Sequence, residues 1–295
     1  PRMAMNTMLI GAVANTLLDP LFIFVFHWGI EGAAWATIIS QAISAIWVTY
    51  YFLRGKSSLK IHKKYLKLNG SIVKGIISIG SAPFALQIAG SLVSVIMNKS
   101  LLVYGGDVAI TGMGIINSIA MMILMPIFGI NQGAQPIIGF NYGAKKFDRV
   151  KLTWKYAIAA ASCVALVGFT IVMLYPIALI SMFNNKDLEL IAFGSKAIRI
   201  FLIFLPIIGF QIVSSNYFQA VGKPKKSMVL SISRQVLFLI PAVLILPRFF
   251  GLNGLLYAGP TSDLLSSIIT GIMIFYEMKH LDESHEAEEI RLSEV

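Results

Sequence analysis

The sequence WGIEGAAWA at residues 28–36 returns in a related form, FGLNGLLYA, at residues 250–258. Both copies have glycine at the second and fifth positions, alanine at the ninth, and aromatic residues at the first and eighth. The copies start 222 residues apart, 250 minus 28. Short glycine and aromatic patterns also recur by chance in membrane proteins. A second match, PRMAM at residues 1–5 with PKKSM at 224–228, lies at an offset of 223 and favours a true internal repeat.

The composition is that of a membrane protein. Hydrophobic residues make up 57% of the chain and charged residues 13%, and the mean hydropathy is +0.77. A soluble domain carries about 25% charged residues, and a membrane-spanning helix needs about 20 apolar residues. We therefore expect an all-α integral membrane protein with eight transmembrane helices, at residues 3–26, 31–53, 74–103, 108–140, 152–181, 190–220, 227–247 and 254–276.

The repeat predicts how these helices are organised. It pairs the first two predicted spans with the last two, six spans apart, so both copies cross the membrane in the same direction. Such a parallel repeat is related by an axis along the membrane normal. We expect twelve spans in two six-helix bundles, four of them preceding this chain. The predicted parts are the last two N-lobe helices (1–53), a basic cytoplasmic linker (54–71), a six-helix C-lobe (72–280) and an acidic cytoplasmic tail (281–295).

The charge distribution predicts the orientation. The net charge of +10 comes mainly from basic residues in 54–74, 145–155 and 223–226, which follow the second, fourth and sixth predicted spans. The alternate loops carry few basic residues. This is the positive-inside pattern, so it favours cytoplasmic basic loops and a cytoplasmic C-terminus over binding to nucleic acid. We expect a monomer in the bacterial cytoplasmic (inner) membrane, in contact with lipid.

Several motifs resemble one transporter family. They are NTLLDPLFI at 15–23, GIEGAAWAT at 29–37, QGAQPIIGFNYGA at 132–144 and FQAVGKPKK at 218–226. Together they are similar to sequences of the multidrug and toxic compound extrusion (MATE) transporters, in the MepA-like bacterial branch. The resemblance extends over about residues 1 to 276.

The resemblance implies alternating access between two lobes around a central cavity. It also implies export of cationic amphiphilic drugs in exchange for protons or sodium. It implies no cofactor beyond this coupling ion. The family's best-known coupling carboxylate belongs to the first helix of the N-lobe, which has no counterpart in this sequence, so that role is not assigned to any residue here.

Ionisable residues inside the membrane are functional candidates because burying charge there is costly. Asp19 lies one turn after Asn15 and directly before Pro20, so it is either an ion-coupling site or a carboxylate that stabilises a kink. Asp263 is either functional or a structural partner of Arg234. Arg234 either pairs in this way or snorkels to the interface. For Arg199, nearer an outer helix end, we expect snorkelling.

Polar residues recur at helical spacing along several spans. The predicted cavity lining comprises Gln87, Ser91, Ser94 and Asn98 on the third span, Asn117, Met121 and Met125 on the fourth, and Gln211 and Ser215 on the sixth. Such faces either line an aqueous path or join helices by hydrogen bonds. Methionine suits promiscuous binding surfaces, although a methionine stripe is also common in ordinary packing.

The sequence contains no catalytic constellation. A P-loop is missing, and no histidine or cysteine spacing indicates a metal site. We therefore expect a transporter with no catalytic residues and no bound metal. Two alternatives stay open: a lipid-linked precursor flippase of the same two-lobe plan, and a membrane scaffold or sensor that does not transport.

Overall fold

A computed structural model describes residues 2–54 and 69–293 of the chain. Its regular elements are all helical over these residues. The chain divides into two compact units, Pro1–Lys74 and Gly75–Val295, and each is described by itself. The predicted linker, residues 54–71, falls almost entirely outside the described residues.

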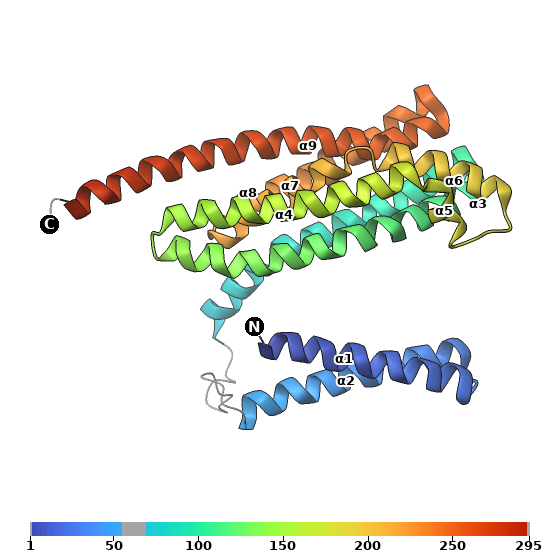
Figure 1. Cartoon of the computed structure of the whole chain (residues 1–295), viewed down its shortest axis with the longest axis horizontal. Helices are drawn as coiled ribbons and strands as arrows, with labels where there is room; N and C mark the ends of the chain where they lie inside the picture. Colours follow the sequence, from blue (N-terminus) through green and yellow to red (C-terminus); the bar gives the residue numbers. More distant parts are fainter. Residues whose placement is uncertain (1, 55–68, 294–295) are drawn as a thin grey trace. The chain divides into compact units, whose positions relative to one another are not determined.

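Unit 1 is a helical hairpin. It contains α1 (Arg2–Pro20), a π-helical turn η1 (Leu21–Val25) and α2 (Gly29–Arg54) (Figure 1). Gly29 turns the chain into α2 with φ of +54°, a left-handed conformation that favours glycine. Gly32 lets the start of α2 pack against the backbone of η1, because a Cβ atom on Gly32 would lie 2.9 Å from the carbonyl carbon of Phe22.

Unit 2 is a bundle of longer helices. In chain order it contains α3 (Gly70–Gly143, of which the residues from Gly75 onward belong to unit 2), α4 (Phe147–Leu174), α5 (Pro176–Ser181), α6 (Leu188–Phe201), α7 (Leu205–Ala220), α8 (Pro224–Ile232), the π-helix η3 (Ser233–Leu239) and α9 (Ile240–Ser293). α4 and α9 both pack against α7 (Figure 1). α9 continues as a helix into the acidic segment that the sequence predicts as a tail.

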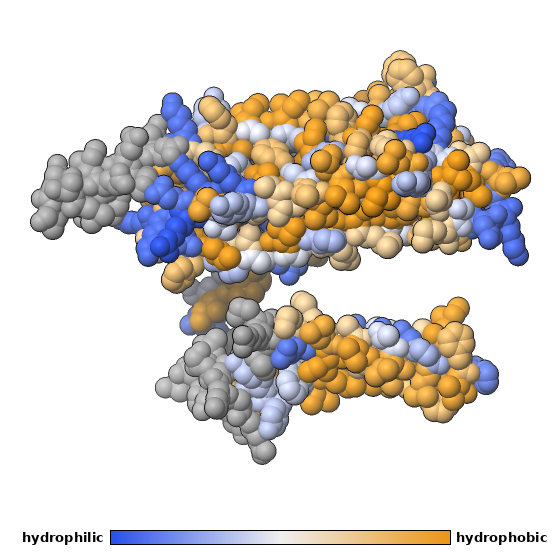
Figure 2. Space-filling model, viewed as in Figure 1, coloured by the Kyte–Doolittle hydropathy of each residue, from blue (hydrophilic) through white to orange (hydrophobic). Residues whose placement is uncertain are grey.

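The membrane-spanning segments agree with the predicted fold class. Among the residues that the structure describes, five helices are long and apolar enough to cross a membrane, and six if α6 and α7, which meet at 50°, form one bent span. Two of these are broken inside, α3 at Gly106 and α9 at Gly251, where the backbone leaves the helical region. Counting both halves of each broken helix gives eight segments. Unit 2 accordingly presents an apolar band with hydrophilic residues at both ends (Figure 2).

The two echoed motifs have the same local geometry. Gly251 has φ of +56°, close to the +54° of Gly29. Gly254 matches Gly32, since a Cβ atom on Gly254 would lie 2.5 Å from the carbonyl carbon of Leu246. Each copy thus uses one glycine to reverse the chain and a second to let the following helix pack against the preceding one.

Small residues bring α4 and α7 together. Ala157, Ala161 and Ala165 are buried along one face of α4. On α7, a Cβ atom added to Gly209 would lie 2.9 Å from the carbonyl carbon of Ala161. Close packing of small residues is how membrane helices associate where lipid removes the hydrophobic driving force. α4 and α7 therefore pack closely against each other.

Candidate functional site

Unit 2 contains a polar hollow between its helices. One part has a volume of about 600 Å³ and is lined by both halves of α3, the α6–α7 bend, η3 and α9. A second part, of about 500 Å³, is lined mainly by α3, α7 and η3. The parts adjoin, because Gly90, Met121, Arg234 and Gln235 line both. We call the two parts together the central cavity.

The structure brings seven of the nine predicted lining residues to this cavity. Ser94, Asn98 and Asn117 line the first part, Gln87, Gln211 and Ser215 line the second, and Met121 lines both. The two α3 segments come side by side because α3 reverses direction at Gly106. Residues from three predicted spans therefore face one space.

Ser91 and Met125 do not line the cavity. Gly90 takes the place expected for Ser91, and Leu124 the place expected for Met125. Met125 is instead 63% exposed on the outside of the bundle. The lining is shifted by one residue only at these two positions, because Gln87, Ser94, Asn98 and Met121 on the same helix do line the cavity.

An ion pair lies at the cavity wall. Arg234 Nε donates to Asp263 Oδ1 at 2.7 Å, and its Nη2 lies 2.6 Å from the same oxygen. The Asp263 side chain is 6% exposed and that of Arg234 is 37% exposed. Ser262 Oγ also donates to the Arg234 carbonyl at 3.0 Å. The structure therefore pairs the two intramembrane charges, and Arg234 keeps its guanidinium open to the cavity.

Gln235 was not predicted as a cavity-lining residue, but in the structure it lines both parts of the central cavity. Its amide lies 3.9 Å from where a Cβ atom of Gly90 would be. It belongs to the π-helical segment η3, and π-helical turns are frequent at functional sites because they reset the helical register. The sequence signal for it is its place in the Arg234–Gln235 pair before Pro241, a pattern that resembles the same transporter family.

Hydrogen bonds between helices fix other predicted residues. Gln211 Nε2 donates to Ser266 Oγ at 2.6 Å, which joins α7 to α9. The hydroxyls of Ser215 and Ser231 lie 3.1 Å apart and join α7 to α8. These two residues therefore combine both alternatives raised for polar faces, because they line the cavity and also connect helices.

Asn15 and Asp19 lie in unit 1, where both are half-buried on α1. The Asn15 amide donates to Asp19 Oδ1 at 3.4 Å. The helix changes to π-helical hydrogen bonding immediately after Pro20. The structure thus places Asp19 beside its predicted neighbour and next to the irregularity in α1.

A second charged cluster lies at the end of unit 2 that carries the basic loops. Glu277 on α9 is buried and bonds both Lys223 and Lys226, the latter at 2.9 Å. Burial lowers the pKa of Lys223, but the hydrogen bond and charge of Glu277, with a contribution from Tyr142, outweigh it and raise that pKa above its usual range. These ion pairs connect the segment at the start of α8 with α9.

The chemistry of the central cavity is that of a binding site. Its polar groups are amides, hydroxyls and one ion pair, and Met121 adds a thioether. Within the described ranges, 2–54 and 69–293, no group of three histidine, cysteine, aspartate or glutamate side chains is placed to hold a metal ion. Such a lining offers hydrogen-bonding groups and a polarisable apolar surface to a small molecule.

Comparisons with known proteins agree with this description. A family model described as MatE matches residues 83–244. "Multidrug export protein MepA" of Staphylococcus haemolyticus (strain JCSC1435) is 24% identical over 275 residues, which are 93% of this chain and 60% of that protein. The protein of the same name from Staphylococcus aureus (strain MSSA476) has the same identity and coverage. The chain thus spans 60% of the length of the curated relatives that it matches.

Solved structures with the same fold are also transporters. A MOP superfamily transporter from Pyrococcus furiosus superposes with a TM-score of 0.86 at 23% identity, over 95% of this chain and 63% of that one. A multidrug resistance MATE family transporter in an outward-facing conformation also reaches 0.86 at 23% identity, over 94% of this chain and 62% of its own. The chain therefore has the helical fold of these two-lobe transporters.

Proposed function

This chain belongs to the MatE family, whose model matches residues 83–244, and from that premise we propose that the full-length protein is a secondary active multidrug efflux antiporter. It exports cationic amphiphilic compounds in exchange for protons or sodium ions by alternating access. It is a transporter and not an enzyme, in keeping with relatives that are named multidrug export proteins. We place it as a multi-pass protein in the bacterial cytoplasmic membrane, as a monomer with a cytoplasmic C-terminus.

The lining of the central cavity supports this substrate class. Neutral amides from Asn98, Asn117 and Gln87 offer oxygen atoms to a cation without binding it as tightly as several carboxylates would. Met121 adds a flexible, polarisable surface that adapts to different apolar groups. Together these features suit a site that must accept varied cations and then release them.

The Arg234–Asp263 pair is the single observation that carries the coupling proposal. Asp263 is the one carboxylate among the described residues that line the central cavity. When Asp263 is ionised, it neutralises Arg234 or attracts a cationic substrate. When a proton binds Asp263, the positive charge of Arg234 is no longer compensated and repels the cation. Proton uptake and substrate release are thereby linked.

The Asn15–Asp19 pair is a second proposed coupling site. It offers one carboxylate and one amide oxygen, both half-buried in unit 1. Oxygen ligands of this kind suit sodium as well as a proton. We therefore assign Asp19 and Asp263 as the two ion-coupling positions, with Asn15 and Arg234 as their partners.

Proteoliposomes containing the full-length protein test this function. We expect ethidium efflux when an inward proton or sodium gradient is imposed separately, and no efflux when both gradients are dissipated. Efflux that requires ATP, or no efflux under either gradient, would contradict the proposal. Successful flipping of a lipid-linked precursor without ethidium efflux would favour the flippase alternative.

A further inference from the structure

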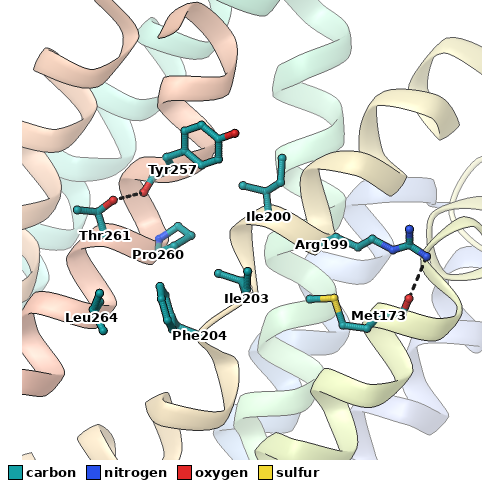
Figure 3. Close-up of a pocket in the computed structure, with 9 residues that line it drawn as sticks. All are labelled: Met173, Arg199, Ile200, Ile203, Phe204, Tyr257, Pro260, Thr261 and Leu264. Carbon is teal, nitrogen blue, oxygen red and sulfur yellow. Dashed lines mark hydrogen bonds between the residues drawn. The ribbon is translucent and has the colours of Figure 1, made fainter. Parts of the chain in front are cut away.

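A second hollow, which we call the flank pocket, lies on the side of unit 2. It has a volume of about 510 Å³ and opens between the end of α4, the α6–α7 bend and α9 (Figure 3). It belongs to the end of unit 2 away from the loops at 144–146 and 221–223, because α4 runs from those loops to Leu174. The two segments that form most of it are residues 199–204 and 257–264.

The walls of the flank pocket are mainly apolar. Ile200, Ile203 and Phe204 face it from the α6–α7 bend, and Pro260 and Leu264 face it from α9 (Figure 3). The hydroxyl of Thr261 donates to the Tyr257 carbonyl at 2.7 Å, so it is already engaged. The apolar walls suit a hydrocarbon chain.

Arg199 supplies the only charge at the flank pocket among the residues that the structure describes there. Its Nη2 donates to the Met173 carbonyl, at 3.0 Å, in the last turn of α4 (Figure 3). A guanidinium has five N–H donors, and the described part of the chain provides no carboxylate for the remaining ones. The side chain is exposed. An unpaired guanidinium at a membrane helix end therefore presents several donors to an external acceptor.

A thin wall separates the flank pocket from the central cavity. Phe201, Leu202 and Gly259 line the central cavity, whereas their chain neighbours Ile200, Ile203 and Pro260 line the flank pocket. Phe201 and Gly259 are in tight contact, since a Cβ atom on Gly259 would lie 2.6 Å from the Phe201 ring. An occupant of the flank pocket would thus press on the outer side of the wall that closes the central cavity.

We propose that the flank pocket binds an anionic phospholipid, with an acyl chain along the apolar walls and the phosphate on Arg199. The hydrocarbon tail gains little from transfer out of the bilayer, because lipid tails are as apolar as the pocket walls. Selectivity must then come from the headgroup, where the guanidinium pairs with phosphate. The same charge disfavours a cationic amphiphile, which distinguishes this pocket from the central cavity.

Lipid binding is measured without transport, so its outcome is independent of the proposed antiport. The purified full-length protein is mixed with phosphatidylglycerol and phosphatidylcholine, and the bound lipid is counted by native mass spectrometry. We expect at least fivefold preference for phosphatidylglycerol, reduced to near equality in Arg199→Gln and partly kept in Arg199→Lys. Lys186→Gln is the matched control, because it removes a positive charge from the loop before α6. We expect this variant to keep the preference for phosphatidylglycerol.

A variant that fills the flank pocket with a larger side chain tests the contribution of the apolar walls separately from that of the Arg199 charge. Ile203→Trp adds bulk to the pocket and leaves Arg199 in place, so we expect it to lower phosphatidylglycerol binding severalfold. The proposal is wrong if the wild type binds both lipids equally, or if Arg199→Gln and Arg199→Lys keep the full preference. It is equally wrong if tetraphenylphosphonium binds and Ile203→Trp abolishes that binding, because the occupant would then be a cation.

Discussion

Asp263 and Arg234 stabilise each other across the gap between η3 and α9. Replacing Asp263 with Asn removes the acceptor charge and leaves the guanidinium uncompensated. Breaking a fully buried pair costs roughly 3–5 kcal/mol. Arg234 is 37% exposed, and solvent screening reduces the cost, so we expect a loss of about 1–2 kcal/mol in the free energy of unfolding. Denaturant unfolding in detergent measures it.

The double variant Arg234→Met/Asp263→Leu is the control for this prediction. Replacing both charges with apolar residues removes the uncompensated guanidinium, so it should recover most of the stability that Asp263→Asn loses. If Asp263→Asn is as stable as the wild type, the ion pair does not contribute to the free energy of unfolding, and the prediction that it stabilises the contact between η3 and α9 is wrong.

Asn117 faces the central cavity from the second half of α3. Asn117→Leu keeps a similar size and removes the amide, so we expect cation affinity to fall by about 1 kcal/mol, or roughly fivefold. Met125→Leu is the matched control on the same helix, because Met125 is 63% exposed outside the cavity. Equilibrium dialysis of tetraphenylphosphonium compares them. Equal losses in both variants would contradict the assigned lining face.

At the scale of the element, the glycine turns define where the long helices reverse. Gly251 has φ of 56° and ψ of −136°, a conformation that costs a residue with a Cβ atom about 1–3 kcal/mol. We expect Gly251→Ala to lower the free energy of unfolding by that amount. Gly271→Ala, elsewhere in α9 with open space around its Cβ position, should be neutral or slightly stabilising. Thermal unfolding in detergent distinguishes them.

The sequence predicts these elements well because hydropathy and the repeat are strong signals. The echoed motifs indicated equivalent turns, and Gly29 and Gly251 have nearly equal φ angles. The lining faces are less predictable. From Gln87, both Gly90 and Ser91 lie within about 60° of the same helical face, so packing against η3 and α7 decides which of them lines the cavity.

The local helical register around η3 was the least accessible feature, whereas the charge pair could be anticipated. Asp263 and Arg234 could be recognised as a possible pair because each is costly alone in the membrane. Gln235 could not, because its direction depends on the π-helical turn that begins at Ser233. Composition and residue spacing do not predict that turn.

At the scale of the whole molecule, the alternation of basic loops predicts orientation. The basic residues within 145–155 and 223–226 lie on the predicted cytoplasmic side. A green fluorescent protein fused to the C-terminus should therefore fluoresce in cells, and an alkaline phosphatase fused there should be inactive. An active phosphatase with a dark fluorescent protein would reverse the orientation, and with it the direction assigned to export.

Competition between cation and proton for the central cavity, through Asp263, is the basis of the proposed coupling. It is tested most directly by measuring the affinity of the full-length protein for tetraphenylphosphonium as a function of pH. We predict that affinity weakens as the pH falls, because a proton and the cation compete for the same carboxylate. In Asp263→Asn the affinity should be lower and independent of pH. A wild-type affinity that does not change with pH, or a pH dependence that survives in Asp263→Asn, would contradict the claim.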